Sequence, residues 1–156
     1  MNNTGARQNA STPEKLRFAR QIFQKMLKLE IVTPERKVIE AEVDSVTVPT
    51  ASGEAGILAN HAPLISALKP GIVTISGKET PDQLAIGGGF VEVSNNVVSV
   101  LTESAITADE ADPQKARQMR EEAEAAIAAA AMLPIEDSEA ARGQLDAANA
   151  ILQLAK

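Results

Sequence analysis

The stretch from residue 28 to residue 102 is divided into short apolar segments rich in β-branched residues, and this pattern constrains the fold more than any other feature of the sequence. Turn-forming clusters such as Lys69-Pro70-Gly71 and Ser94-Asn95-Asn96 separate the segments. Apolar and polar residues alternate in 90–93 and 97–100, so each of these segments has one solvent-facing side. Many short strands at this spacing predict an antiparallel β-sandwich or barrel. The predicted strands are residues 28–32, 38–48, 56–58, 64–68, 71–76, 83–86, 90–93 and 97–101.

Two helices are predicted after residue 107. Asp112-Pro113 combines a capping residue with proline at the first helical position, and an Ala-rich run continues to residue 133. A second helix is expected over residues 137–155 after a short turn, which predicts an antiparallel helical hairpin. The residues predicted to face each other are mostly alanine, so at about 25 cal/mol per Å² the interface contributes only a few kcal/mol.

The N-terminal 27 residues form a third part of the chain. Residues 1–10 are polar and are expected to be disordered, whereas Thr12-Pro13-Glu14 is a typical helix start. Apolar residues at helical spacing from Leu16 to Leu27 then predict an amphipathic helix with a basic face. This helix could be a docking arm, a structural helix on the body, or a cleaved organellar presequence. The sequence leaves these three readings open.

We therefore expect an N-terminal extension at 1–27, an antiparallel β-sandwich at 28–107 and a C-terminal helical hairpin at 108–156. Charge is divided unevenly among them, because residues 1–28 carry a net charge of +5 and the remainder carries −11. An acidic body argues against nucleic acid as the main partner. A basic arm on such a body suits an acidic surface or a membrane.

Composition excludes several kinds of chemistry. The chain has no cysteine, which rules out disulfides and thiolate metal sites, and its single histidine leaves only an all-oxygen metal site. Neither a calcium-loop motif nor a Gly-x-Ser-x-Gly motif is present. Gly87-Gly88-Gly89 leads into a strand, which predicts a bulge or a close strand crossing instead of a phosphate cradle. We expect no catalytic residue, no metal and no cofactor, and the longest apolar run is too short to span a membrane.

One constrained loop stands out between two predicted strands. Residues 53–64 contain two glycines, a carboxylate, the only histidine and a proline, and Pro70-Gly71 follows shortly afterwards. Glycine permits unusual backbone conformations and proline fixes φ, so such a turn holds its polar side chains in place. The predicted structural turn residues are Gly53, Gly56, Pro63, Pro70 and Gly71. Glu54 and His61 are the polar side chains that the loop presents.

This loop resembles the epsilon subunit family of F-type ATP synthases, whose mitochondrial counterpart is called delta. The resemblance covers residues 28–156. It rests on Gly-x-x-Gly-Ile-Leu-x-x-His-Ala-Pro-Leu at 53–64, Leu-Lys-Pro-Gly at 68–71 and Gly-Gly-Gly-Phe-Val-Glu-Val at 87–93. It implies a non-catalytic rotor subunit that connects the gamma subunit to the membrane rotor ring. The loop matches the ring-facing loop of the family, so Glu54 and His61 are implied ring contacts.

The resemblance also implies a location and a regulatory element. The chain is expected to be a peripheral membrane protein on the cytoplasmic face of a bacterial inner membrane, or on the equivalent organellar face, and to meet the membrane only through its complex. The hairpin of the family folds against the sandwich or extends toward the catalytic alpha and beta subunits and blocks rotation. Whether this hairpin inhibits, and whether the ion is a proton or sodium, stays open. The alternatives from other classes are a small carboxylate hydrolase and a sandwich binding module unrelated to ATP synthase.

Nucleotide binding by the hairpin is expected to be absent or weaker than millimolar. Family members that bind ATP there show Ile/Leu-Asp-x-x-Arg-Ala, whereas this chain has Asp112 and then Lys115 in place of the arginine. Lysine lacks the planar fork that binds phosphate in a bidentate manner. The second helix adds only Arg142. Asp112, Lys115 and Arg142 are therefore the candidates for a weak nucleotide contact.

Overall fold

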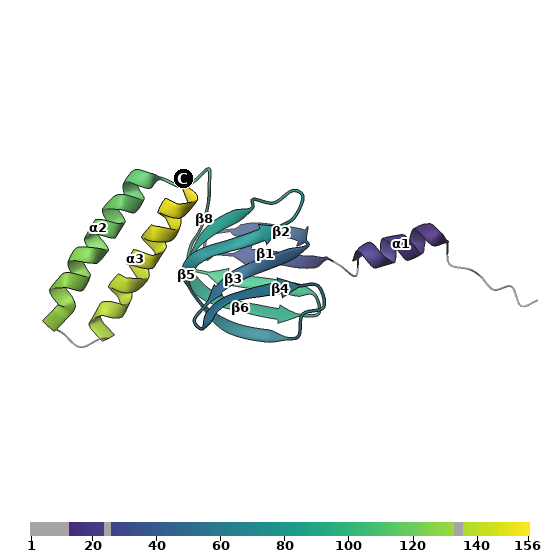
Figure 1. Ribbon diagram of the computed structural model, residues 1–156, viewed down its shortest axis with the longest axis horizontal. Coiled ribbons are helices and arrows are strands. Elements are labelled where there is room, and N and C mark those ends of the chain that lie inside the picture. The colour runs from purple at the N-terminus through teal and green to yellow at the C-terminus, as the bar shows by residue number, and fades with distance from the viewer. Residues whose placement is uncertain (1–12, 24–25, 133–135) are drawn as a thin grey trace, which may run out of the picture.

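The computed structural model describes residues 13–23, 26–132 and 136–156 (Figure 1). A β-sandwich forms the body, a pair of helices packs on one side of it, and a separate short helix precedes it. This arrangement confirms the predicted fold class. The expected disorder of residues 1–10 lies outside the described residues, and the boundaries at 27/28 and 107/108 stay predictions. The elements are α1 (Glu14–Phe23), β1 (Leu27–Val32), β2 (Lys37–Val43), β3 (Ser45–Thr50), β4 (Gly53–Leu58), β5 (Leu64–Ser76), β6 (Gln83–Ser94), β7 (Val97–Thr102), β8 (Ala105–Thr107), α2 (Pro113–Ala129), a 3-10 turn (Ala130–Met132) and α3 (Glu136–Leu154).

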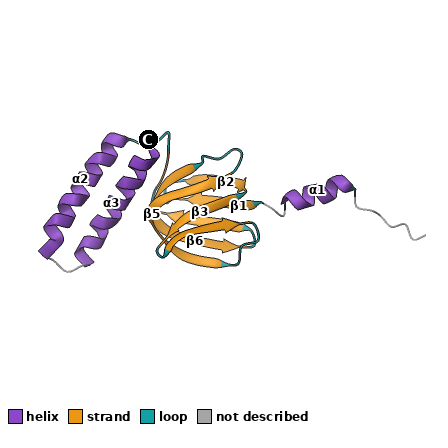
Figure 2. Cartoon of the chain, viewed as in Figure 1, coloured by secondary structure: helices purple, strands orange, loops and turns teal. Residues whose placement is uncertain are grey.

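The strands follow the order β2-β1-β7-β6-β5-β3-β4, and β8 pairs with β6. Every pair is antiparallel except β1 with β7, which run parallel from Lys28 opposite Val97 to Val32 opposite Leu101. The long strands β5 and β6 stay paired along most of their length and belong to both layers. The sheet therefore folds over on itself through these two strands (Figure 2).

The two bends in these strands correct part of the sequence prediction. Breaks were predicted at 69–70 and at 87–89, but the chain continues through both as bent strands. Gly88 and Gly89 have φ of 99° and 138°, and a Cβ on Gly89 would lie 1.9 Å from the carbonyl oxygen of Leu101. The predicted close crossing is confirmed, because only glycine fits there. The Thr102 hydroxyl donates a hydrogen bond to the carbonyl oxygen of Gly88 and stabilises the bend.

Two further boundaries differ from the prediction. The segment 38–48 was predicted as one strand, but Asp44 separates β2 from β3. Leu27 was assigned to the N-terminal helix, whereas it is the fully buried first residue of β1. Its side chain enters the sandwich core, and burial of a leucine outweighs a weak local preference for helix.

Aliphatic side chains fill the space between the two layers. Among the described residues the core cluster contains no aromatic side chain. Strand alternation sends every second residue inward, so Val91 and Val93 of β6 meet Val98 and Val100 of β7. The fully buried large residues are Leu27, Leu29, Ile31, Val43, Val46, Val48, Ile57, Val73, Leu84, Ile86, Val91 and Val93.

The helical hairpin packs against the bent part of the sandwich. Helix α3 contacts β5 and β6, and α2 packs on α3 at a greater distance from the sheet (Figure 1). The fully or nearly fully buried hairpin residues are mainly alanines, namely Ala116, Ala123, Ala141, Ala148 and Ala150. Asp112 caps α2, since its carboxylate accepts hydrogen bonds from the backbone N–H groups of Gln114 and Lys115.

Candidate functional site

Glu54 lies beside the turn that joins β3 to β4. It is exposed and faces Pro49 across the pair. The Thr50 hydroxyl is buried and donates to the carbonyl oxygen of Gly53 at 2.5 Å, and Gly53 itself has φ of 129°. These contacts fix the turn, so the Glu54 carboxylate projects from a rigid support.

His61 lies in the turn that follows β4. Its backbone N–H donates to the carbonyl oxygen of Leu58 at 3.1 Å, and its Nδ1 lies 2.7 Å from the carbonyl oxygen of Ala62. A carbonyl oxygen only accepts, so Nδ1 carries the proton and Nε2 is the ring nitrogen offered to a partner. The side chain is partly exposed.

A pair of asparagines clamps this turn to the β6–β7 turn. The backbone N–H of Asn60 donates to Oδ1 of Asn96 at 2.5 Å, and Nδ2 of Asn96 donates to Oδ1 of Asn60 at 3.1 Å. Asn60, Asn95 and Asn96 all have positive φ, a conformation that asparagine tolerates better than most residues. Sequence reasoning missed this clamp, although Asn95-Asn96 between two strands is a signal for a tight turn.

Glu54 and His61 lie toward opposite ends of β4. Glu54 pairs with Pro49 and Leu58 pairs with Ser45, so the four steps along β4 from Glu54 to Leu58 span roughly 13 Å at the usual rise of a strand. We call the end with residues 60–63 and 95–96 the His61 end, and the end with the bends at 69–71 and 87–89 the hairpin end. Glu54 lies near the hairpin end because Thr50 pairs with Leu68. The two predicted ring contacts are therefore separate features.

The predicted structural turn residues occupy different settings. Gly53 is in a turn-closing position with positive φ, and Pro63 precedes β5. Pro70 and Gly71 lie within β5 at its bend, where a Cβ on Gly71 would meet Pro49 at 3.0 Å. Gly56 lies within β4 and has open space around its Cβ position, so it is not part of a turn and its hydrogen side chain is not sterically required.

An apolar cluster lies on one part of the outer face of β1, β6 and β7. Phe90 and Leu101 are paired across β6 and β7 and are 59% and 56% exposed. They line a shallow hollow of about 400 Å³ together with Val32 and Pro34. On the neighbouring strand β5, Ile65 is 77% exposed and points to the same face, since it pairs with Glu92, two residues beyond Phe90. We call Val32, Phe90 and Leu101 the apolar row; exposed apolar side chains that gather in this way are typical of partner-binding surfaces.

A network of ion pairs surrounds Lys28 and Glu40 on the same side of β1 and β2. The Lys28 ammonium lies 2.9 Å from both Glu30 and Glu40, and Lys37 lies 2.7 Å from Glu40. The hydrogen bonds from Lys37 and Lys28 lower the pKa of Glu40 to about 2, and those with Glu30 and Glu40 raise the pKa of Lys28. Glu40 therefore stays ionised and paired over the physiological range.

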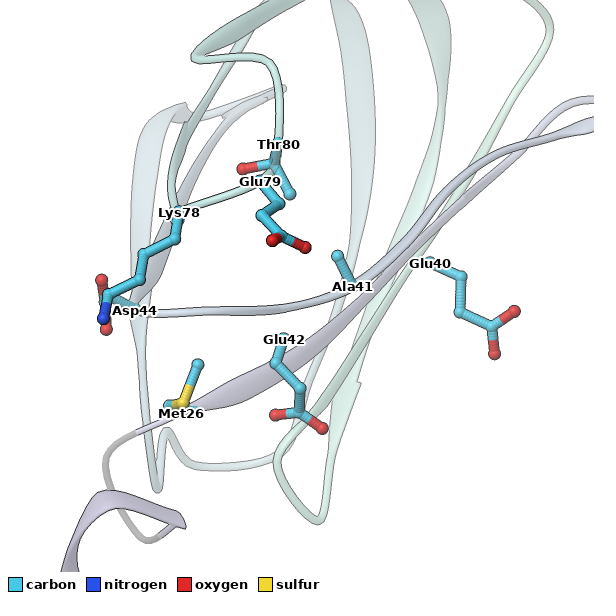
Figure 3. A pocket seen from close by; sticks show the side chains of 9 residues that line it. Met26, Glu40, Ala41, Glu42, Asp44, Lys78, Glu79 and Thr80 are labelled. Atoms are coloured by element: carbon cyan, nitrogen blue, oxygen red, sulfur yellow. The ribbon is translucent and has the colours of Figure 1, made fainter.

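An acid-lined hollow of about 610 Å³ lies where the chain enters β1 (Figure 3). Glu42, Asp44 and Glu79 surround it together with the ion-paired Glu40. Its floor includes Ala41 and Met26. No group of three or more His, Asp or Glu side chains within the described part of the chain is arranged to hold a metal ion.

The three candidate nucleotide contacts do not converge. The Asp112 carboxylate is occupied as the helix cap, and the exposed Lys115 ammonium lies 4.0 Å from it. Lys115 lines the same hollow as Ile151 of α3. Arg142 is nine residues earlier on α3, which is roughly 13 Å along a helix. The packed hairpin thus offers no shared anion site from these three residues.

A second ion pair joins the sandwich to the start of the hairpin. Arg36, in the β1–β2 turn, lies 2.5 Å from the Glu110 carboxylate, which also accepts from the backbone N–H and hydroxyl of Thr107 at 3.1 Å. The backbone hydrogen bond from Thr107, followed by that from Arg36, lowers the pKa of Glu110. Sequence reasoning missed this contact because its partners are 74 residues apart.

Residues 26–108 match the family model for the ATP synthase, Delta/Epsilon chain, beta-sandwich domain. The chain is 42% identical over 100 residues to the ATP synthase epsilon chain of Desulforamulus reducens, covering 64% of this chain and 76% of that protein. It is 44% identical over 99 residues to the ATP synthase epsilon chain of Moorella thermoacetica, covering 63% and 74%.

Two solved assemblies contain chains of similar fold. One belongs to the mitochondrial ATP synthase of Euglena gracilis, with a TM-score of 0.67 and 22% identity over 97% of this chain and 88% of that one. The other belongs to the central stalk and c-ring of the mitochondrial ATP synthase of Tetrahymena thermophila, with a TM-score of 0.56 and 16% identity over 85% and 98%. None of the helices in the described ranges is long and apolar enough to cross a bilayer.

Proposed function

This chain belongs to the family of ATP synthase delta and epsilon chains, and on that premise we propose that it is a non-catalytic rotor subunit of a proton-translocating F-type ATP synthase. It joins the gamma subunit to the membrane rotor ring and passes torque between them. The observation that carries this proposal is the match of the whole sandwich, residues 26–108, to the family. The complex works at the cytoplasmic face of a bacterial inner membrane or at the equivalent organellar face.

The construction of the sandwich supports a mechanical role. A body that passes torque must resist shear between its layers, and a dry aliphatic core packed at crystal-like density provides that resistance. The glycine crossing at 88–89 and the Asn60–Asn96 clamp fix the two ends of the sandwich. Polar side chains on the surface of such a rigid body keep their positions when torque is applied.

The apolar row supports a specific contact with gamma. The large apolar side chains of Phe90 and Leu101 are exposed to water. Burying them against a partner is favourable, because it removes apolar surface from water. The outer face of β1, β6 and β7 is therefore the surface that packs on gamma. Glu54 and His61 are proposed to contact the rotor ring as two separate polar contacts. The hairpin is proposed to reach the catalytic alpha and beta subunits when it leaves the sandwich, and to bind nucleotide no more tightly than millimolar.

Association with gamma tests this function. Phe90→Ser combined with Leu101→Ser should reduce co-purification of gamma with the tagged chain at least tenfold, because two exposed anchors are lost. Leu58→Ser is the matched control, since Leu58 is 62% exposed but lies on β4 in the other layer. If wild-type chain fails to retain gamma, the rotor role is wrong and an unrelated sandwich binding module becomes the better reading. If all three forms retain gamma equally, only the assignment of the surface is wrong.

A further inference from the structure

Helix α1 extends beyond the His61 end, on the side of the sandwich away from the hairpin (Figure 1). Pro13 directly precedes the helix, and its carbonyl oxygen accepts hydrogen bonds from the N–H groups of Leu16 and Arg17 at 2.8 and 3.2 Å. Every described side chain from 13 to 19 is exposed, including Leu16 at 57% and Phe18 at 66%. A ten-residue helix is marginal in water without a surface to pack on.

The sequence of α1 places most of its apolar side chains on one side of the helix and basic side chains beside and opposite them. With 3.6 residues per turn, Leu16, Phe18 and Ala19 lie on one half of the helix, and Arg17 lies opposite Ala19. Lys15 lies beside Ala19, and its long aliphatic stem lets its ammonium group reach outward to the polar side. Two of the three phenylalanines of the whole chain, Phe18 and Phe23, occur within this helix. The surface that α1 fits must therefore accept bulky apolar groups next to cationic ones.

The distribution of charge along the chain indicates which kind of surface α1 binds. The ion pairs among the described residues join Lys28, Arg36, Lys37 and Lys115 to carboxylates, and none of them involves Lys15 or Arg17. Residues 1–28 carry +5, while the rest of the chain carries −11. An anionic surface attracts α1 and repels the body, so contact through α1 alone is favoured.

We propose that α1 is an interfacial anchor that binds the anionic headgroups of a lipid bilayer through Lys15 and Arg17 and buries the half of the helix with Leu16 and Phe18 at the acyl boundary. Short basic helices with Phe and Leu on the other side lie in this plane of a membrane. A fluid lipid surface also requires no matching shape, unlike an acidic protein groove. The acid-lined hollow beside Met26 is one acidic groove of the sandwich, and α1 extends away from the sandwich (Figure 1).

This anchor adds a direct contact to a chain that the sequence led us to expect at the membrane only through its complex. A single short helix binds weakly, so the contact is reversible and serves to hold one end of the protein near the surface. The proposal concerns the isolated chain and does not depend on the rotor role. Its failure would leave the association with gamma unaffected.

Vesicle co-sedimentation of the full-length chain tests the anchor. Vesicles of equal parts phosphatidylglycerol and phosphatidylcholine should bind the wild type at low salt, whereas pure phosphatidylcholine vesicles should bind it far less. Each basic residue near an anionic surface contributes about fivefold, so K15E combined with R17E should lower the partition coefficient at least about 25-fold. The control K69E combined with K78E makes the same change in net charge at exposed positions of the body and should retain binding.

Circular dichroism supplies a second readout. Anionic vesicles should increase the helical signal of the wild type and of the control but not that of the K15E/R17E variant. F18S should weaken binding to anionic vesicles at both low and high salt, because it removes apolar burial instead of charge. Absence of wild-type binding to anionic vesicles would overturn the proposal and point to an acidic protein groove instead. Equal loss in the α1 variant and the body control would also overturn it.

Discussion

At the scale of single residues, the ion pair between Arg36 and Glu110 connects the sandwich to the helical hairpin. Glu110 lies three residues before the start of α2, and its partner lies in the β1–β2 turn. The contact therefore ties the base of the hairpin to the sandwich. Both side chains are about half exposed, so the pair contributes a fraction of a kcal/mol up to about 1 kcal/mol.

The pH dependence of stability follows from the lowered pKa of Glu110. A carboxyl group whose pKa falls on folding stabilises the native state above its unfolded pKa, and this contribution disappears as pH drops through the folded pKa. Glu110→Gln should therefore reduce the free energy of unfolding by up to about 1 kcal/mol at pH 7 and have a smaller effect near pH 3. Urea titrations at both pH values measure this difference. Glu103→Gln is the control, and an equal cost at both pH values would contradict the prediction.

The separation of Glu54 and His61 leads to a second prediction at this scale. Because the two side chains lie toward opposite ends of β4, they should contribute independently to coupling between ATP hydrolysis and proton pumping in reconstituted vesicles. Glu54→Gln and His61→Ala should each weaken coupling, and the double variant should show the product of the two effects. Glu79→Gln, which removes an exposed carboxylate from the β5–β6 turn, is the matched control for charge loss. A single variant as damaging as the double would show that the two act as one unit, and unchanged coupling in the double variant would remove both from the interface.

At the scale of elements, most strands and both C-terminal helices could be predicted from periodicity. Alternation identified β7 and the second half of β6, and Asp112-Pro113 marked the start of α2. The bent strands were harder, because Pro70 and Gly87 read locally as breaks while sheet pairing on both sides carries the chain through them. The parallel pairing of β1 with β7 joins residues about 70 positions apart, which no local pattern reports.

The candidate sites show the same limit. The loop with Glu54 and His61 was found because its glycines and proline are adjacent in sequence. The clamp of Asn60 with Asn96 and the apolar row both combine distant strands and became visible only with the register. Phe90 was readable as part of an alternating strand, but alternation alone does not say which side faces water.

The hairpin carries the prediction that belongs to this scale. Alanines supply most of its buried residues, so the free-energy difference between the packed hairpin and a released one should be a few kcal/mol. If the released hairpin blocks rotation, deletion of residues 134–156 should raise ATP hydrolysis by the assembled complex severalfold. Replacing Ala148 and Ala150 by serine, without deletion, should weaken packing and lower the rate. An unchanged rate in both forms would mean that the hairpin does not inhibit.

At the scale of the whole molecule, the three parts differ in what holds them. The sandwich is held by a continuous aliphatic core and by pairing of every strand. The hairpin rests on α3 contacts with β5 and β6 and on one exposed ion pair. Helix α1 exposes all of its described side chains. Rigidity therefore decreases from the body outward, which suits a torque-bearing centre with a movable regulator on one side.

This gradient predicts how protection against hydrogen exchange is distributed. Exchange protection reports the free energy of local opening, which depends on the apolar area that an element buries. Amides of β1, β6 and β7 should therefore exchange only on global unfolding, whereas those of α2, which packs mainly on α3, should exchange at least a hundredfold faster in the isolated chain. Mass spectrometry of peptides from the two regions measures the ratio. Equal protection of α2 and β6 would mean that hairpin and sandwich unfold as one unit, and the hairpin could not then serve as a switch separate from the body.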